Sequence, residues 1–189
     1  MLNIKNLGDK AASQDIQHSI FNLFGDHRYK IFNSFIFEWE SDFLSIADET
    51  NYVYEVEIKV SKNDFKKDFK KEDKHVLLES SYKTNKEKIE PTLSKVLPNK
   101  FFYACPRNTI TSFGIPEYAG FIEISESETG FSANIVKNAP FLHKQNIFDI
   151  IKPLFLDKFY HKYVRTEFEN YELQKKIKLL EEQIKKLNK

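Results

Sequence analysis

The sequence predicts an α/β domain that continues into a C-terminal helix, and three patterns carry this prediction. Residues 52–60, YVYEVEIKV, alternate between apolar and polar side chains, which is the period of a strand. Apolar side chains recur at helical spacing over residues 13–24, and Gly25 follows as a helix terminator. From about residue 144 the apolar spacing is helical to the end of the chain.

Composition sets the size of the domain and excludes several classes of protein. The 189 residues suit one domain with an appendage, and we expect a domain at 1–160 and a helix at 161–189. The net charge of +1 provides no global argument for binding nucleic acid or an acidic membrane. A single cysteine, Cys105, excludes an internal disulfide, and we expect it to be a buried strand thiol. With neither a signal peptide nor a bilayer-spanning stretch, the expected location is cytoplasmic.

Further strands and turns are expected before and after the alternating strand. Residues 1–11 suggest a loose arm, and Ser13 is the expected cap of the first helix. The DETN sequence at 48–51 predicts a turn, and residues 128–130 predict the turn of a later hairpin. Aromatic and β-branched content predicts strands at 29–37, 43–47, 101–105, 120–125 and 131–137.

A lysine-rich helix is predicted directly after the alternating strand. Ser61 can cap it, with Asp64 as the capping-box acid three residues on. Phe65 and Phe69 are four residues apart, so they should dock the helix on the sheet. Its lysines remain for solvent or ligand, and residues 72–97 are polar, with short helices expected.

The residues with the clearest chemical potential lie on the alternating strand. Glu57 and Lys59 are two residues apart, so they share one strand face at a spacing of roughly 7 Å. Asp42 begins the preceding strand, and the 48–51 turn would bring it toward Glu57. Two carboxylates at one site suit Mg²⁺, for which Mn²⁺ can substitute, and Lys59 would hold the attacking water. The alternative is a solvated strand face of an ordinary antiparallel sheet.

Residues 39–75, WESDFLSIADETNYVYEVEIKVSKNDFKKDFKKEDKH, resemble the PD-(D/E)XK nuclease superfamily, and its MmcB-like DNA-repair and phage branch most closely. FFYACP at 101–106 and IPEYAGFIEI at 115–124 are similar to a later strand, loop and strand of that branch. The resemblance covers roughly residues 35–126. It implies a restriction-endonuclease-like, three-layer αβββαβ core with a mixed sheet, a Mg²⁺ site, and hydrolysis of phosphodiester bonds in DNA.

The resemblance also implies roles for particular residues. Asp42 matches the motif aspartate, Glu57 the second acid and Lys59 the lysine, so Asp42 and Glu57 would bind the metal. Ser41 stands where the family usually has a proline, which is not catalytic. An additional acid could come from the first helix or from the rim of the site, and the sequence leaves this choice open between Asp15, Gln17, Glu40 and Glu55.

The basic residues after the motif are candidates for contacts with the DNA backbone, which position a nucleic acid without reading its sequence. The candidates are Lys62, Lys66, Lys67, Lys70, Lys71, His75 and Arg107. The alternative for the lysines is a solvated helix face. For His75 it is a packed or surface histidine, and for Arg107 an ordinary loop charge. Tyr118 lies in a loop that could also flank the site.

A stripe of apolar residues near the C-terminus indicates a coiled coil. It consists of Leu173, Ile177, Leu180, Ile184 and Leu187, which step by four and three over roughly two heptads. We expect this helix to join two copies of the chain in a homodimer. The alternative is that the helix packs on its own domain.

Together these patterns predict a Mg²⁺-dependent DNA nuclease in DNA repair, recombination or phage DNA metabolism. Two other hypotheses stay open: a non-catalytic DNA- or protein-binding member of the same fold, and an adaptor that acts through its coiled coil. The sequence does not distinguish double-stranded, single-stranded or branched substrates.

Overall fold

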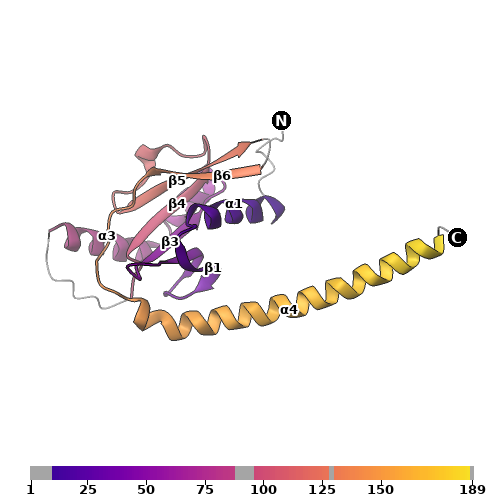
Figure 1. Ribbon diagram of the computed structural model, residues 1–189. Coiled ribbons are helices and arrows are strands. Elements are labelled where there is room, and N and C mark those ends of the chain that lie inside the picture. Colours follow the sequence, from indigo (N-terminus) through magenta and orange to yellow (C-terminus); the bar gives the residue numbers. More distant parts are fainter. Residues whose placement is uncertain (1–9, 88–95, 128–129, 188–189) are drawn as a thin grey trace. The chain divides into compact units, whose positions relative to one another are not determined.

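The computed structural model describes residues 10–87, 96–127 and 130–187 (Figure 1). The chain divides into two compact units, residues 1–151 and 152–189, and each is treated by itself. The first unit therefore ends near the position where the sequence placed the end of the domain, residue 160. No helix in the described parts of the chain is long and apolar enough to cross a membrane.

The first unit is built on a six-stranded mixed sheet whose strands follow one another in chain order. β2 pairs antiparallel with both β1 and β3. The strands β3, β4 and β5 run parallel to one another, and β6 pairs antiparallel with β5. The predicted α/β class with a mixed sheet is confirmed. The strands are β1 (His27–Phe35), β2 (Glu40–Ala47), β3 (Val53–Ile58), β4 (Lys100–Pro106), β5 (Ala119–Ser127) and β6 (Gly130–Lys137).

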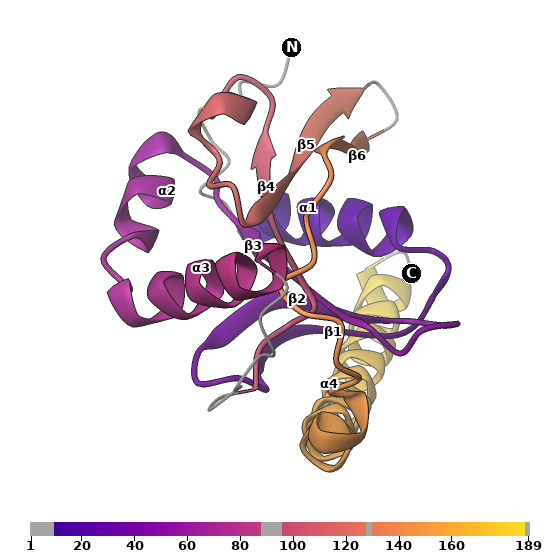
Figure 2. The same cartoon turned by 90° about the vertical axis from the view of Figure 1, so that its left-hand side faces the viewer.

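Helices cover both faces of this sheet (Figure 2). On one face, α1 (Lys10–Leu23) packs Ile16 and Ile20 against Val56 of β3. On the other, α2 (Lys62–Asp68) and α3 (Glu72–Lys86) pack with alternate residues of β4, among them Tyr103. Because successive strand residues point to opposite faces, Glu55, Glu57 and Lys59 of the alternating segment face α2 and α3.

The start of the first helix differs from the prediction. The helix begins at Lys10, so Ser13 lies inside it and the expectation of a Ser13 cap is wrong. Ala11 and Ala12 are strong helix formers and extend the helix by about a turn. Of the expected loose arm at 1–11, residues 10 and 11 are helical, and residues 1–9 lie outside the described chain.

The predicted cap of the basic helix is confirmed in detail. The Ser61 hydroxyl accepts a hydrogen bond from the Asp64 backbone N–H at 3.1 Å. The Asp64 carboxylate reaches back to the backbone N–H of Val60 at 3.2 Å, one residue before the cap. These bonds start α2 three residues after Lys59 and fix where its side chains lie relative to the end of β3.

The second unit contains most of α4 (Phe148–Leu187), a single helix of 40 residues. Its five stripe residues, from Leu173 to Leu187, are each more than half exposed. The predicted C-terminal helix is confirmed, and its apolar stripe is exposed.

Gly120 on β5 has no room for a larger residue. A Cβ atom there would lie 2.4 Å from the Phe102 ring and 2.6 Å from the Ala139 backbone nitrogen. We expect Gly120→Ala to lower the free energy of unfolding by about 1–3 kcal/mol, the usual cost of overpacking a core. Urea denaturation measures this loss. Gly114→Ala is the control, because its Cβ would meet only Ile110 Cγ2 at 3.4 Å; equal losses in the two variants would contradict the packing argument.

Candidate functional site

Asp42, Glu57 and Lys59 lie together at one end of the β2–β3 hairpin. The pairing of Phe43 with Val56 places Asp42 opposite Glu57 if the register continues by one residue. Asp42 Oδ2 accepts a hydrogen bond from the Ile58 backbone N–H at 2.7 Å. This bond ties the first acid to the residue between Glu57 and Lys59. The structure thus brings together the three residues that the sequence selected.

Glu57 is surrounded by lysines. Its Oε1 lies 2.7 Å from Lys59 Nζ and 3.3 Å from Lys71 Nζ, and its Oε2 lies 2.9 Å from Lys74 Nζ. Glu57 and Lys59 are only 3% and 6% exposed. The alternative of a solvated strand face is therefore wrong, because α2 and α3 cover it.

Asp68 is a fourth acid at the site, and the sequence argument did not select it. Its Oδ1 lies 3.1 Å from Lys59 Nζ and 3.2 Å from Lys71 Nζ, and its Oδ2 accepts a hydrogen bond from the Tyr103 hydroxyl at 2.8 Å. The helical period could have found it, because Asp68 is three residues after Phe65 and so shares the buried face of α2.

Glu55 and Lys74 complete what we call the ion cluster, defined as Glu55, Glu57, Lys59, Asp68, Lys71 and Lys74. Glu55 is fully buried, so it does not belong to an exposed acidic rim. Its Oε1 accepts a hydrogen bond from Trp39 Nε1 at 2.7 Å and lies 3.2 Å from Lys74 Nζ. Lys74 Nζ also sits 4.7 Å from the Phe101 ring centroid, a cation–π contact inside the cluster.

Electrostatics separate Asp42 from Glu57 and Asp68, whose pKa values are lowered by the hydrogen-bonding partners and lysines around them, whereas burial raises the pKa of Glu55 as well. Burial, and then repulsion by Glu57, raise the pKa of Asp42 to about 6. Burial opposes the ionisation of Glu57 as well, but Lys74 and Lys59 outweigh it and lower the pKa of Glu57. Glu57 and Asp68 raise the pKa of Lys59 against its desolvation, so Lys59 stays charged at neutral pH. Lys59 has three N–H donors, and Glu57 and Asp68 occupy two directions around it.

Several other predicted site residues lie elsewhere. Asp15 is exposed on α1, which covers the opposite face of the sheet, so it is not brought to Glu57. Gln17, on the same helix, donates a hydrogen bond to Asn33. Glu40 is exposed at the start of β2. Neither α1 residue is placed to serve as the additional acid, because the sheet separates α1 from the ion cluster.

The predicted DNA contacts divide into exposed and buried groups. His75 is buried, and its Nδ1 lies 2.7 Å from the Tyr118 hydroxyl, so it is a packed histidine and is not available to phosphate. Arg107 is exposed and pairs with Glu123 at 3.8 Å. Lys71 belongs to the ion cluster. The remaining lysines of this stretch, Lys62, Lys66, Lys67 and Lys70, are exposed.

Cys105 has the environment that the sequence predicted. It is a buried strand residue, and burial raises its pKa to about 12. A thiol of this kind is not a nucleophile at neutral pH.

A hollow of about 460 Å³ leads from the surface to the ion cluster. Its inner wall includes Trp39, Lys71 and Lys74, each of which contacts Glu55 or Glu57. Its remaining lining residues are Glu38, Lys70, Glu72, Asp73 and Leu77. Charged groups of both signs therefore surround the entrance.

The donor chemistry of Asp42 and Glu57 fits a hydrated divalent cation. No group of three or more acids, histidines or cysteines in the described ranges is arranged to hold a metal ion. A carboxylate offers about four lone-pair directions. Glu57 uses three for lysines and Asp42 uses one for Ile58. Mg²⁺ commonly binds through one or two carboxylates and keeps its waters, so two acids suffice for such a site.

Comparisons with known proteins give a fold and no family. No family model matches the chain, and no curated protein matches it. One solved structure, described as "SPO1766 protein of unknown function from Silicibacter pomeroyi", is similar with a TM-score of 0.53 and 14% sequence identity. The similarity covers 81% of this chain and 86% of that one. It shows that the two chains share a fold.

Asp42 should destabilise the protein at neutral pH. Its folded-state pKa of about 6 lies above the ordinary value of 3.8, so its stabilising contribution is fully present below pH 4 and is lost as the pH rises through 6. We expect Asp42→Asn to raise the free energy of unfolding at pH 7 by about 1–3 kcal/mol, at 1.4 kcal/mol per pKa unit. The gain should vanish below pH 4.

Urea denaturation from pH 3.5 to 7.5 measures this difference. Asp48→Asn is the matched control, because the Asp48 side chain is 64% exposed in the turn that joins the same two strands. An Asp42→Asn variant that is less stable than the wild type at pH 7 would contradict the inference that the ionised Asp42 side chain destabilises the folded protein.

Proposed function

We propose that the protein is a Mg²⁺-dependent deoxyribonuclease of the PD-(D/E)XK type. The observation that carries this proposal is the convergence of the Asp42 and Glu57 carboxylates beside the charged Lys59 at one end of the β2–β3 hairpin. The raised pKa of Asp42 adds support, because it reflects burial and, after it, repulsion by Glu57, and a divalent cation would relieve that repulsion.

The order of secondary structure also supports this proposal. The chain runs through α1, then β1, β2 and β3, then α2 and α3, then β4. This order has two helices between β3 and β4 and helices on both faces of the sheet, so it is compatible with the αβββαβ core that the resemblance of residues 35–126 implies. In such a core the acids and the lysine belong on the second and third strands, where Asp42, Glu57 and Lys59 lie or directly follow.

Each residue of the site has a distinct task in this proposal. Asp42 and Glu57 would hold the cation, which when bound lowers the pKa of a coordinated water and stabilises charge on the phosphate. Lys59 remains protonated, so it donates hydrogen bonds and does not act as a base. Its remaining N–H direction orients the attacking water or a phosphate oxygen. Asp68 and Glu57 position the Lys59 ammonium by their ion pairs.

A specific observation favours a second candidate, a non-catalytic DNA-binding protein of the same fold. Both oxygens of Glu57 already contact lysines, and Asp68 is also paired. A cluster so completely neutralised holds less negative charge for a cation than two free carboxylates would. Cleavage assays separate this candidate from the nuclease.

The nuclease proposal predicts metal-dependent cleavage that requires Asp42. With Mg²⁺ or Mn²⁺, the wild type should cut plasmid, single-stranded or branched DNA, and gel electrophoresis would record the products. Asp42→Asn should lower the rate on the order of a hundredfold or more, and Lys59→Met by a similar factor. At subsaturating Mg²⁺ the wild-type rate should fall as the pH drops through 6, because protonation of Asp42 then competes with binding of the cation.

Asp48→Asn is the control for the charge change, and the expected stability of Asp42→Asn keeps its loss of activity from being attributed to unfolding. Cleavage that survives in both Asp42→Asn and Lys59→Met would overturn the site assignment. If no DNA form is cut with either metal and DNA still binds, the non-catalytic candidate is the better description.

We propose further that the stripe on α4 makes the protein a homodimer. The stripe residues are all exposed, at the spacing of a two-stranded seam; they are Leu173, Ile177, Leu180, Ile184 and Leu187.

Leu180→Asp should convert the dimer into a monomer, which sedimentation equilibrium would measure. Leu179→Asp makes the same chemical change one residue away, off the seam, at a side chain of similar exposure. A wild-type monomer, or equal effects of both variants, would contradict the seam.

A further inference from the structure

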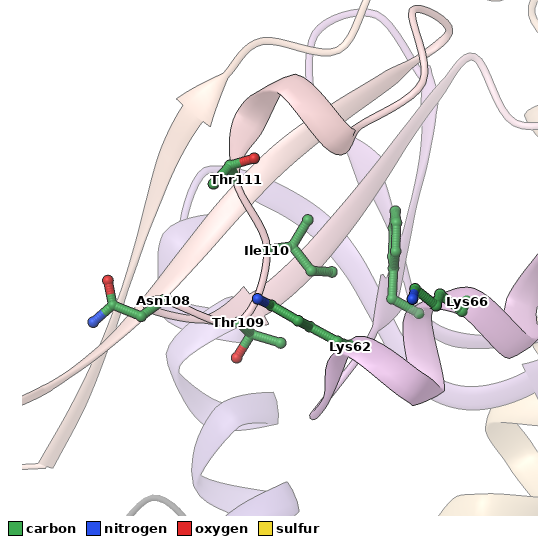
Figure 3. A pocket seen from close by; sticks show the side chains of 7 residues that line it. Lys62, Lys66, Asn108, Thr109, Ile110 and Thr111 are labelled. Carbon is green, nitrogen blue, oxygen red and sulfur yellow. The ribbon is translucent and has the colours of Figure 1, made fainter.

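A second hollow lies beside the C-terminal ends of the neighbouring strands β3 and β4 (Figure 3). Its volume is about 260 Å³. One wall comes from α2, and the other from the loop that follows β4. The lining residues are Lys62, Phe65 and Lys66 of α2, and Asn108, Thr109, Ile110 and Thr111 of the loop.

This hollow adjoins the candidate active site. Lys62 is three residues after Lys59, so their Cα atoms are at most roughly 11 Å apart. The Phe65 ring centroid lies 4.9 Å from that of Tyr103, whose hydroxyl binds Asp68, the partner of Lys59. A DNA strand with its reacting phosphate at Lys59 would therefore place a neighbouring nucleotide at this hollow.

Backbone conformation and backbone hydrogen bonds fix the loop that forms the second wall of this hollow. Asn108 has a left-handed conformation with φ of 65°, which asparagine tolerates better than most residues. Thr109 N–H donates to the Pro106 carbonyl at 3.0 Å, and Gly114 N–H donates to the Thr111 carbonyl at 2.9 Å. The Asn108 amide and the hydroxyls of Thr109 and Thr111 are thus presented on a defined turn.

The chemistry of the hollow is apolar inside and positive at its rim. Phe65, only 8% exposed, and Ile110 provide the apolar surface. Lys62 and Lys66 are exposed, and Figure 3 shows the Lys62 side chain extending from α2 toward Thr109 and Ile110. Within the described chain neither ammonium forms an ion pair, whereas Lys71 and Lys74 beside the first hollow are paired with acids.

We propose that this hollow binds one unpaired nucleobase of the DNA strand, with the adjoining phosphates on Lys62 and Lys66. The inference rests on the proposed function, and it names the substrate class of that site as DNA with at least one unstacked nucleotide. The volume is below the roughly 300–1,000 Å³ of pockets that enclose whole drug-sized ligands, so it suits a base and not a duplex. Unpaired bases stack on aromatic side chains such as Phe65 with little sequence preference, while lysines contact the phosphates.

The test is DNA binding without divalent metal, measured by fluorescence anisotropy of labelled oligothymidylate and of a blunt hairpin duplex. The full chain carries Asp42→Asn, so binding is read apart from cleavage. We expect tighter binding of oligothymidylate than of the duplex. The double variant Lys62→Ala and Lys66→Ala should make the slope of the logarithm of the association constant against the logarithm of the salt concentration less negative by about 1.4. Each phosphate contact to a single strand contributes about 0.7 to the size of that slope. Ile110→Glu should weaken binding about tenfold or more.

Two matched variants control for general charge effects. Lys144→Ala removes an exposed lysine outside α2 that does not line the hollow, and should leave the salt slope unchanged. Val76→Glu places the same acid at a side chain on α3 that is 63% exposed and outside the hollow. Near-UV circular dichroism would check that all variants are folded.

Three outcomes would overturn the inference: no binding of oligothymidylate, equal effects of the hollow variants and their controls, or duplex binding as tight as single-strand binding. Any of these can occur while wild-type protein still cuts duplex DNA with Mg²⁺, in which case the nuclease proposal stands alone. Conversely, Lys62- and Lys66-dependent binding of oligothymidylate with no cleavage of any DNA supports the hollow and rejects the nuclease.

Discussion

The burial of Glu55 and Glu57 under α3 is the constraint on which the rest of this site depends. A buried carboxylate without a partner is costly, and removing one member of a buried ion pair commonly costs 3–5 kcal/mol. Lys74 meets both acids, and it comes from the helix that covers them. The helix that covers Glu55 and Glu57 therefore also supplies the ammonium group that neutralises their charge, so α3 cannot pack on the sheet without forming these ion pairs. This coupling also fixes the ammonium of Lys59, because Glu57 and Asp68 hold it from two sides.

Asp42 differs from the other acids of the site because none of the lysines around Glu57 forms an ion pair with it in the described chain. Its stabilising contact is a backbone N–H, and Glu57 repels it. Perturbed pKa values cluster at functional sites, so the raised pKa of Asp42, at a position that no lysine pairs with in the described chain, is the feature that suggests chemistry. The site combines acids and lysines that pair with one another and one carboxylate, that of Asp42, whose ionisation is disfavoured by burial and by Glu57 and which pairs with none of these lysines.

Much of the fold followed from local patterns, and the parts that did not follow depend on packing. The alternation of residues 52–60, the hairpin before it and the Ser61 cap are local features that a sequence displays directly. Asp68, Lys71 and Lys74 were not selected as partners of Glu57, because their roles depend on which faces of α2 and α3 meet the sheet. The same uncertainty made His75 a candidate for phosphate contact, although the structure buries it against Tyr118. The lysine-rich composition of this segment suggested a solvent-exposed helix face, whereas Lys71 and Lys74 form ion pairs with the acids of the ion cluster.

Trp39 gives the ion cluster an optical reporter. It is the single tryptophan of the chain, and its indole N–H donates to Glu55 inside the cluster. Indole emission responds to the charge and polarity around the ring, so the tryptophan fluorescence of the unlabelled protein, excited where its nine tyrosines do not absorb, reports on one place only. Binding of a cation or a nucleic acid near Glu57 can thus be followed in the native chain, with no probe attached and no reaction required.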